Sequence, residues 1–314
     1  RVLSYLYMYL GVSIYYAESI EKVADNLKEV QPEIFGCVPR LFEKVYDKII
    51  AKGSDLTGIK KKLFFWAVEL GLKYEINGAN GAWYEFQLKL ARKLIFSKWQ
   101  EALGGKVRVA ISGGAALQPR LARIFWAAQI PILEGYGLTE TSPVICVNTL
   151  EPGGLKFTTV GKALDRVTVR IAEDGEILCK GPNVMLGYYK RPDLTAEMID
   201  SDGWLHTGDI GEFVDGVYLR ITDRKKEIFK TSGGKYIVPQ SIENKLKESR
   251  FIEQVMVIGE NRKYAAALIV PNFVFVKEWC ERKQIPVPAS NEELIRIERV
   301  KNRVMKDVNL VNGT

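Results

Sequence analysis

One twelve-residue stretch, ILEGYGLTETSP at 132–143, constrains this chain more than any other. A strand-like apolar run leads into a Gly-x-Gly turn, which is followed at once by Thr139 and Glu140. Glycines let backbone N–H groups approach an anion closely, a hydroxyl can bind a phosphate oxygen, and a carboxylate can ligate Mg²⁺. The stretch therefore predicts a nucleotide site, although a strand with a tight turn explains it equally well when it is read alone.

A second glycine-rich loop, SGGAAL at 112–117, follows another strand-like run at 107–112. Between the two loops the sequence predicts a helix over 119–128 and a strand over 130–134. The order strand, helix, strand implies parallel strands with a right-handed crossover. Because ligands bind at the carboxyl edge of such sheets, we expect the two loops to converge there.

Composition limits the class of protein. A chain of 314 residues with 47% hydrophobic and 26% charged residues fits a folded globular protein of more than one domain. The four cysteines lie far apart without a CxxC pair, which indicates reduced thiols and, with no visible signal peptide, a cytoplasmic location. The one histidine, His206, is expected to be structural rather than catalytic.

Charge and hydropathy bear on the partners. The formal net charge is +7, and Arg40 to Lys98 contains 12 Lys/Arg against 6 Asp/Glu. This excess suits ATP, CoA or anionic lipid, and we expect peripheral attraction to an anionic membrane. No nucleic-acid module accompanies it, so nucleic acid is not expected as a partner. The uncharged run at 2–17 is short of the roughly 20 residues that span a bilayer, and we expect it in the core.

The predicted secondary structure changes in the second half of the sequence. From Gly161 onward, short strands flank Asp174-Gly175 and Asp215-Gly216, which are hairpin signals. Past Asp223 the pattern is hairpin, helix, two strands and helix. The sequence thus predicts an α/β region at about 1–150, an antiparallel, barrel-like subdomain at about 151–222, a hinge at 223–226, and a small α+β domain at 227–314.

Three blocks, ILEGYGLTETSP, GWLHTGD (203–209) and DRKKEIFKTSGGKYIVPQSIE (223–243), together resemble the adenylate-forming superfamily of acyl-CoA synthetases, luciferases and peptide-synthetase adenylation domains. VPRLFEKVYDKI (38–49) and FSKWQEALGGKVRVAISGGAAL (96–117) look like long-chain fatty acyl-CoA synthetases. The resemblance implies part of a large adenylation domain followed by a small C-terminal domain. It also implies an AMP-forming ligase that joins a fatty acid to CoA through an acyl-adenylate, using ATP and Mg²⁺.

The resemblance assigns most site residues to the nucleotide. Tyr136 packs on adenine, Thr139 binds the α-phosphate and Glu140 ligates Mg²⁺, so that Thr139 and Glu140 are the catalytic pair. In the alternative interpretation these residues have structural roles only: the glycines turn the chain and Tyr136 belongs to the core. The remaining members of the implied nucleotide site are Gly113, Gly114, Ala115 and Gly137.

The same resemblance assigns residues in the later blocks to the ribose, to the domain hinge and to CoA. Asp209 matches the aspartate that binds both ribose hydroxyls, and Arg224 matches an arginine that reaches the ribose. Lys226 matches the hinge about which the small domain rotates, and Gly233 with Gly234 match the hairpin bordering the CoA tunnel. The block GEILCKGPNVMLGYYKRPDLT (175–195) is expected to be scaffold without direct chemistry.

Two family parts are absent from this sequence: the Thr/Gly-rich phosphate loop with its lysine, and the closing lysine motif that stabilises the adenylation transition state. The chain is therefore expected to be a piece of the enzyme, truncated at both ends and inactive or nearly so alone. Two alternatives remain open: an adenylating ligase for another carboxylic acid, and a non-catalytic nucleotide- or acyl-binding remnant. Acyl-chain length and oligomeric state do not follow from the sequence.

Overall fold

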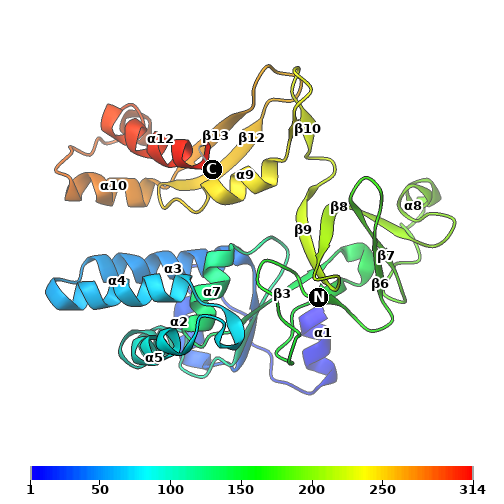
Figure 1. Ribbon diagram of the computed structural model, residues 1–314, viewed down its shortest axis with the longest axis horizontal. Helices are drawn as coiled ribbons and strands as arrows, with labels where there is room; N and C mark the ends of the chain where they lie inside the picture. Colours follow the sequence, from blue (N-terminus) through cyan, green and yellow to red (C-terminus); the bar gives the residue numbers. More distant parts are fainter. Residues whose placement is uncertain (1, 313–314) are drawn as a thin grey trace. The chain divides into compact units, whose positions relative to one another are not determined.

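The computed structural model describes residues 2–312, and the chain divides into two compact units (Figure 1). The first unit is Arg1–Thr207 with Glu212–Ile221, and the second is Gly208–Gly211 with Thr222–Thr314. The boundary therefore passes through two neighbouring strands, β8 and β9. Each unit has a hydrophobic core of its own.

A five-stranded sheet with the order β1-β2-β3-β4-β5 organises the first part of unit one. As predicted, β2 and β3 are parallel; β1 joins them in parallel as well, whereas the last two strands are added antiparallel. The register places Cys37, Ser112 and Glu134 side by side at the carboxyl ends of the parallel strands. The strands are β1 (Ile34–Cys37), β2 (Val109–Ser112), β3 (Ile132–Gly137), β4 (Val144–Val147) and β5 (Lys162–Ala163).

Helices pack on the parallel strands around buried aromatic rings. Phe42 and Phe125 meet edge to face with centroids 5.4 Å apart, and Trp99 adds a second edge contact to Phe125 at 6.0 Å. Such pairs stabilise a core beyond the area they bury. Proline at the first helical position starts two of these helices, α3 and α7. The helices are α2 (Val23–Val30), α3 (Pro39–Ser54), α4 (Gly58–Leu72), η1 (Ile76–Gly78), α5 (Ala82–Ala91), η2 (Arg92–Phe96, a π-helix), α6 (Ser97–Ala102) and α7 (Pro119–Ala127).

The first helix, α1 (Val2–Tyr9), corrects one expectation. We predicted that the run at 2–17 lies in the core, but Tyr9 is 88% exposed and Tyr16 is 75% exposed. Only one side of α1 is covered, where Leu3 packs against Gly36. A Cβ added to Gly36 would lie 2.3 Å from Leu3 Cδ1. Within residues 2–312, no helix combines the length and apolar character that a bilayer crossing requires.

A four-stranded sheet, ordered β6-β7-β8-β9, confirms the predicted antiparallel region. Asp174-Gly175 forms the hairpin between β6 and β7, where Ile171 pairs with Ile177. The apolar side chains of this sheet share a small core with Tyr136, Ile145 and Leu219. The elements here are η3 (Thr139–Thr141), β6 (Thr168–Ile171), β7 (Glu176–Lys180), α8 (Pro192–Met198), β8 (Leu205–Val214) and β9 (Tyr218–Arg224).

Unit two is the predicted small α+β domain. Its hairpin β12–β13 buries alternate residues against helices, around the fully buried Val276, Cys280 and Leu294. Asn272 caps α10 by accepting a hydrogen bond from the Phe275 N–H. The elements are β10 (Phe229–Lys230), β11 (Tyr236–Ile237), α9 (Pro239–Leu246), β12 (Ile252–Ile258), β13 (Ala266–Pro271), α10 (Phe273–Arg282), α11 (Asn291–Leu294) and α12 (Glu298–Asn312).

Candidate functional site

The loop after β2 reaches the strand β3, as the sequence predicted. The Gly113 N–H donates to the Cys37 carbonyl (3.4 Å), and a Cβ on Gly113 would lie 3.6 Å from the Gly135 carbonyl oxygen. Gly114 has φ +81°, a conformation that glycine adopts without a Cβ penalty. Gly114 and Ala115 are exposed at the carboxyl edge of the sheet. The loop therefore offers accessible backbone beside β3, which suits a flat, polar ligand.

The predicted Gly-x-Gly turn is wrong, because Gly135, Tyr136 and Gly137 continue the strand β3. The chain reverses only after Gly137, where β3 pairs with β4 through an irregular register. A Cβ on Gly137 would lie 1.7 Å from the Pro143 carbonyl oxygen, so this position excludes any other residue. Tyr136 is buried in the core with Ile145, which matches the structural alternative, and its adenine role stays a prediction.

The short helix η3 presents the two residues expected at the phosphate. Thr141 is fully buried, and its hydroxyl accepts from the Leu138 N–H (3.0 Å) and bonds the Pro143 carbonyl. Its side chain thus closes the turn. Thr139 is exposed on the same turn, and Glu140 is half-buried. The turn is held by one threonine and leaves the other accessible.

Glu140 has a partner that the sequence reasoning missed. The Tyr188 hydroxyl donates to Glu140 Oε1 (2.7 Å), and the Met185 N–H donates to the Glu140 carbonyl (2.8 Å). The hydrogen bond to Glu140, with a smaller effect of burial, raises the pKa of Tyr188. The Gly-Tyr pair at 187–188 was read as scaffold, so this part of the prediction needs correction. Only the pair's place in a family block hinted at proximity to the site.

The side chains fit Mg²⁺ in one specific way. Across residues 2–312, no three His, Cys, Asp or Glu side chains gather into a metal cluster. Mg²⁺ is commonly held by one or two carboxylates with substrate phosphates and water. Glu140 can supply such a carboxylate, already oriented by Tyr188, and a nucleotide would have to supply the phosphate oxygens.

A second carboxyl group, Glu134, lies next to the glycine loop. Burial raises the pKa of Glu134 to about 8, opposed by a hydrogen bond from the backbone of Leu117. Its register neighbour Ser112 is 1% exposed, and the Ser112 hydroxyl has no hydrogen-bond partner. The sequence analysis did not single out either side chain. Glu134 stands two residues before Tyr136 in the most informative stretch, and that position was the only available signal.

Asp209 and Arg224 come together on neighbouring strands. Arg224 Nε donates to Asp209 Oδ1 (3.2 Å), and the side chain of Asp209 is 7% exposed while that of Arg224 is 60% exposed. The adjacent Asp223 is 2% exposed, and its Oδ2 has no hydrogen-bond partner. Burial raises the pKa of Asp223. An ion-paired carboxylate beside an exposed guanidinium can bind vicinal hydroxyls.

Lys226 and the second pair of glycines follow directly along the chain in unit two. Lys226 is exposed in the turn after β9, where the Lys225 N–H donates to the Gly208 carbonyl (2.8 Å). Gly233 and Gly234 form the tip of the β10–β11 hairpin, and Gly234 has φ +81°. Space around Gly234 is open within 4 Å. The structure thus places Lys226 in the turn between β9 and β10, and the two glycines at the exposed tip of a hairpin.

His206 is held between two carboxylates. Its Nδ1 lies 3.1 Å from Glu176 Oε2, and its Nε2 lies 3.7 Å from Asp200 Oδ2. Glu176 is 4% exposed, so the imidazole satisfies a buried carboxylate. This arrangement agrees with a structural histidine.

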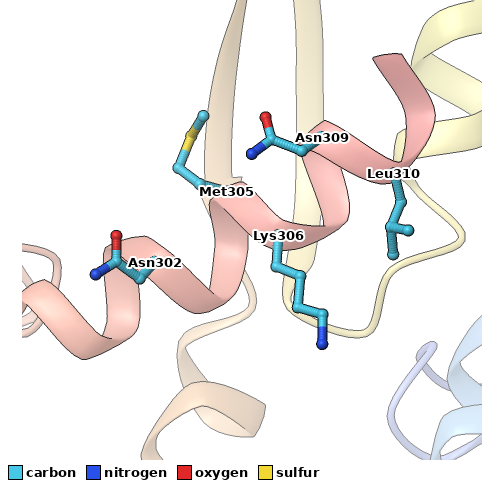
Figure 2. Close-up of a pocket in the computed structure, with 5 residues that line it drawn as sticks. All are labelled: Asn302, Met305, Lys306, Asn309 and Leu310. Atoms are coloured by element: carbon cyan, nitrogen blue, oxygen red, sulfur yellow. The ribbon is translucent and has the colours of Figure 1, made fainter. Parts of the chain in front are cut away.

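A pocket on α12 is lined by residues that are far along the chain from every predicted site residue. Figure 2 shows its five lining side chains, which all project from this one helix. They are Asn302, Met305, Lys306, Asn309 and Leu310. Because one helix face forms the whole lining, the pocket is a shallow surface feature and carries no chemistry of its own.

Comparisons with known proteins agree with this picture. A model of the AMP-binding enzyme family matches residues 2–189, and a model of the AMP-binding enzyme C-terminal domain matches residues 226–306. Long-chain-fatty-acid–CoA ligase 1 from Homo sapiens is 34% identical across 98% of this chain and 45% of its own length. Long-chain-fatty-acid–CoA ligase FadD15 from Mycobacterium bovis is 33% identical across 94% of this chain and 49% of its own length. The chain thus spans less than half of each of these relatives.

Solved structures support the fold. The adenylation domain of a carboxylate reductase from Mycobacterium chelonae superposes with a TM-score of 0.64 at 21% identity, covering 96% of this chain and 42% of that one. ATP-bound MatB from Rhodopseudomonas palustris gives a TM-score of 0.58 at 23% identity, covering 86% of this chain and 46% of that one. The predicted α/β architecture with a small C-terminal domain is confirmed.

Proposed function

Because the chain belongs to the AMP-binding enzyme family, we propose that it is part of an AMP-forming long-chain fatty acid–CoA ligase. In this reaction a carboxylate oxygen of the fatty acid attacks the α-phosphorus of ATP, and pyrophosphate leaves. The sulfur of CoA then attacks the acyl carbonyl carbon of the adenylate, the thiol proton is lost, and AMP leaves. The observation that carries the proposal is the similarity of almost the entire chain to ligases of this substrate class.

The nucleotide roles rest on the carboxyl edge of the parallel strands. We assign adenine to the exposed loop Gly113, Gly114 and Ala115 together with Tyr136 and Gly137. The support is that the loop backbone is accessible and lies within van der Waals distance of Gly135. A rigid strand edge costs little entropy when the ligand binds, since its backbone is already ordered.

Thr139 and Glu140 take the phosphate and the metal. Thr139 would donate its hydroxyl hydrogen to an α-phosphate oxygen, and Glu140 would hold Mg²⁺, which neutralises charge as pyrophosphate departs. Tyr188 fixes the Glu140 carboxylate in one orientation beforehand. Preorganisation of this kind strengthens electrostatic stabilisation, because the dipoles need not reorient during the reaction.

Unit two supplies the remaining roles. Asp209 would accept hydrogen bonds from both ribose hydroxyls, with Arg224 orienting its carboxylate. Lys226 would act as the hinge of the small domain, and Gly233 and Gly234 would border CoA at the hairpin tip. Since the chain spans less than half of its curated relatives, we propose that the complete reaction requires the rest of a longer protein.

Binding of a stable adenylate analogue tests the proposal on the 314-residue chain itself. We expect palmitoyl-sulfamoyl adenosine to bind in calorimetry, and Asp209→Asn to weaken it about 10- to 100-fold, because hydrogen bonds to a charged acceptor are worth about 1.5–3 kcal/mol. Asp202→Asn changes an exposed aspartate and is the matched control. Absence of binding, or equal binding by Asp209→Asn, would overturn the assignment. Tighter binding of the benzoyl analogue would redirect the substrate class to aryl acids.

A further inference from the structure

One helix of unit one presents an apolar stripe to solvent. Trp83, Phe86, Leu90 and Leu94 follow each other at helical spacing along α5 and η2, so they share one face. Their exposed fractions are 72%, 62%, 44% and 40%. The Trp83 and Phe86 rings stack with centroids 5.6 Å apart and planes at 17°. We call these four side chains the α5 stripe.

The opposite side of the same helix is anchored in the core. Leu88, Ala91 and Phe96 are completely buried, and the Tyr84 hydroxyl donates to the Leu70 carbonyl on α4 (2.7 Å). The helix is therefore fixed in rotation, and the stripe is exposed by the packing of the fold. Contiguous exposed apolar surface of this kind commonly marks an interaction site.

Basic side chains accompany the stripe. Lys89, Lys93 and Lys98 are exposed on the same helical segment. The neighbouring helix α4 begins with the exposed Ile59, which is 83% accessible, and then Lys60–Lys62. The Tyr84–Leu70 bond joins the end of α4 to the start of α5. Together 58–72 and 82–102 contain seven Lys/Arg against three Glu.

We propose that the α5 stripe and its lysine rim bind the surface of an anionic phospholipid bilayer. Trp, Phe and Leu on one helical face with Lys beside them is the pattern of an interfacial helix, which lies in the plane of the membrane. The rings and leucines enter the boundary between headgroups and acyl chains. The lysines meet the negative potential at the surface of the bilayer.

This inference goes beyond the proposed reaction and does not need it, since lipid binding can be measured without turnover. Charge complementarity favours the bilayer over a second copy of this chain as the occupant of the stripe. A second copy of this chain would bring a basic rim against another basic rim, which is unfavourable. The stripe would also place the protein where sparingly soluble long-chain acids reside.

Vesicle co-sedimentation of the 314-residue chain tests the proposal. We expect binding to vesicles of phosphatidylcholine with phosphatidylglycerol, weakened at high salt, and little binding to phosphatidylcholine alone. Trp83→Ser with Phe86→Ser should weaken binding at least about tenfold, while the control Met256→Ser with Tyr264→Ser, similarly exposed at 60% and 75%, should not. Lys89→Gln with Lys93→Gln should act through charge alone and weaken binding about 30-fold, unlike the exposed control pair Lys263→Gln with Lys283→Gln.

A second measurement localises the contact. Brominated phosphatidylcholine in anionic vesicles should quench tryptophan fluorescence, and Trp83→Phe should lose most of that quenching while binding persists. Unchanged circular dichroism establishes that each variant is folded. Equal sedimentation of the stripe variants and wild type would overturn the proposal. So would a dimer in analytical ultracentrifugation that disappears in Trp83→Ser with Phe86→Ser while lipid binding stays the same.

Discussion

Two carboxyl groups, each on a central strand of a sheet, are held in opposite ways. Glu134 on β3 is half-buried, and burial raises its pKa to about 8, with a backbone hydrogen bond from Leu117 as the opposing influence. Asp209 on β8 is more deeply buried, yet its carboxylate lies 3.2 Å from the guanidinium of Arg224. The comparison teaches that depth of burial alone does not describe a buried carboxyl group, because one of these groups has a backbone N–H as its partner and the other has a guanidinium. Glu134 is suited to a neutral hydrogen-bonding role, and Asp209 to accepting ligand hydroxyls.

Removing the titration of Glu134 should give the largest effect on stability. The unfolded chain ionises this group near its ordinary pKa of 4.5, whereas the folded chain holds the proton up to about pH 8. Stability therefore falls as pH rises through this window. Glu134→Gln keeps an acceptor for Leu117 and should gain about 2 kcal/mol at pH 8 and nothing at pH 4, after allowance for partial exposure.

Urea unfolding followed by circular dichroism at both pH values measures this gain. Glu173→Gln, an exposed glutamate in a hairpin, provides the control and should be neutral throughout. An equal effect of Glu134→Gln at the two pH values would show that Glu134 does not retain its proton, and the contrast with Asp209 would disappear.

Replacing Arg224 should remove the ion pair that distinguishes Asp209 from Glu134. Arg224→Gln takes away the guanidinium beside a carboxyl group that remains buried, so this group loses its oppositely charged partner. Because the Arg224 side chain is 60% exposed and screened by water, we expect a loss of about 1 kcal/mol at pH 7. Arg224→Lys should recover part of it in the same unfolding measurement, and an unchanged stability curve for Arg224→Gln would contradict the pairing.

The elements of the fold could be predicted because they depend on local sequence. Apolar spacing predicted the helix near α7, and Asp174-Gly175 predicted the β6–β7 hairpin. The strand character of Gly135–Gly137 could not be predicted, because it depends on close packing against the backbone of Pro143. If Gly137 carried a Cβ, that atom would lie 1.7 Å from the Pro143 carbonyl oxygen. Glycine signals permissive backbone, and only the folded partner shows whether that freedom serves a turn or close packing.

The sequence could nominate candidate site residues but could not reveal their contacts. Thr139 and Glu140 stood out because a hydroxyl and a carboxylate follow a glycine pair, which is a short-range signal. The bond from Tyr188 to Glu140 joins residues 48 positions apart, so no local pattern could reveal it. The raised pKa of Glu134 likewise depends on burial by distant parts of the chain.

A third carboxyl group, Glu140, gives the smallest expected effect and refines the comparison. Its partner is the neutral phenol of Tyr188. In the charge of its partner, Glu140 therefore lies between Asp209, which contacts a guanidinium, and Glu134, which accepts a backbone hydrogen bond. Tyr188→Phe should cost about 0.5–1 kcal/mol at pH 7, since one hydrogen bond near the surface is lost. The raised pKa of Tyr188 means that wild-type stability from this bond is present below about pH 10, the ordinary tyrosine pKa, and is lost as pH rises above it. Thermal unfolding at neutral and alkaline pH should therefore show the two proteins converging, while Tyr189→Phe, at an 86% exposed neighbour, follows wild type throughout. A constant difference across this range would mean that the phenol acts by packing, and the proposed metal role of Glu140 would then lose the orienting partner on which it depends.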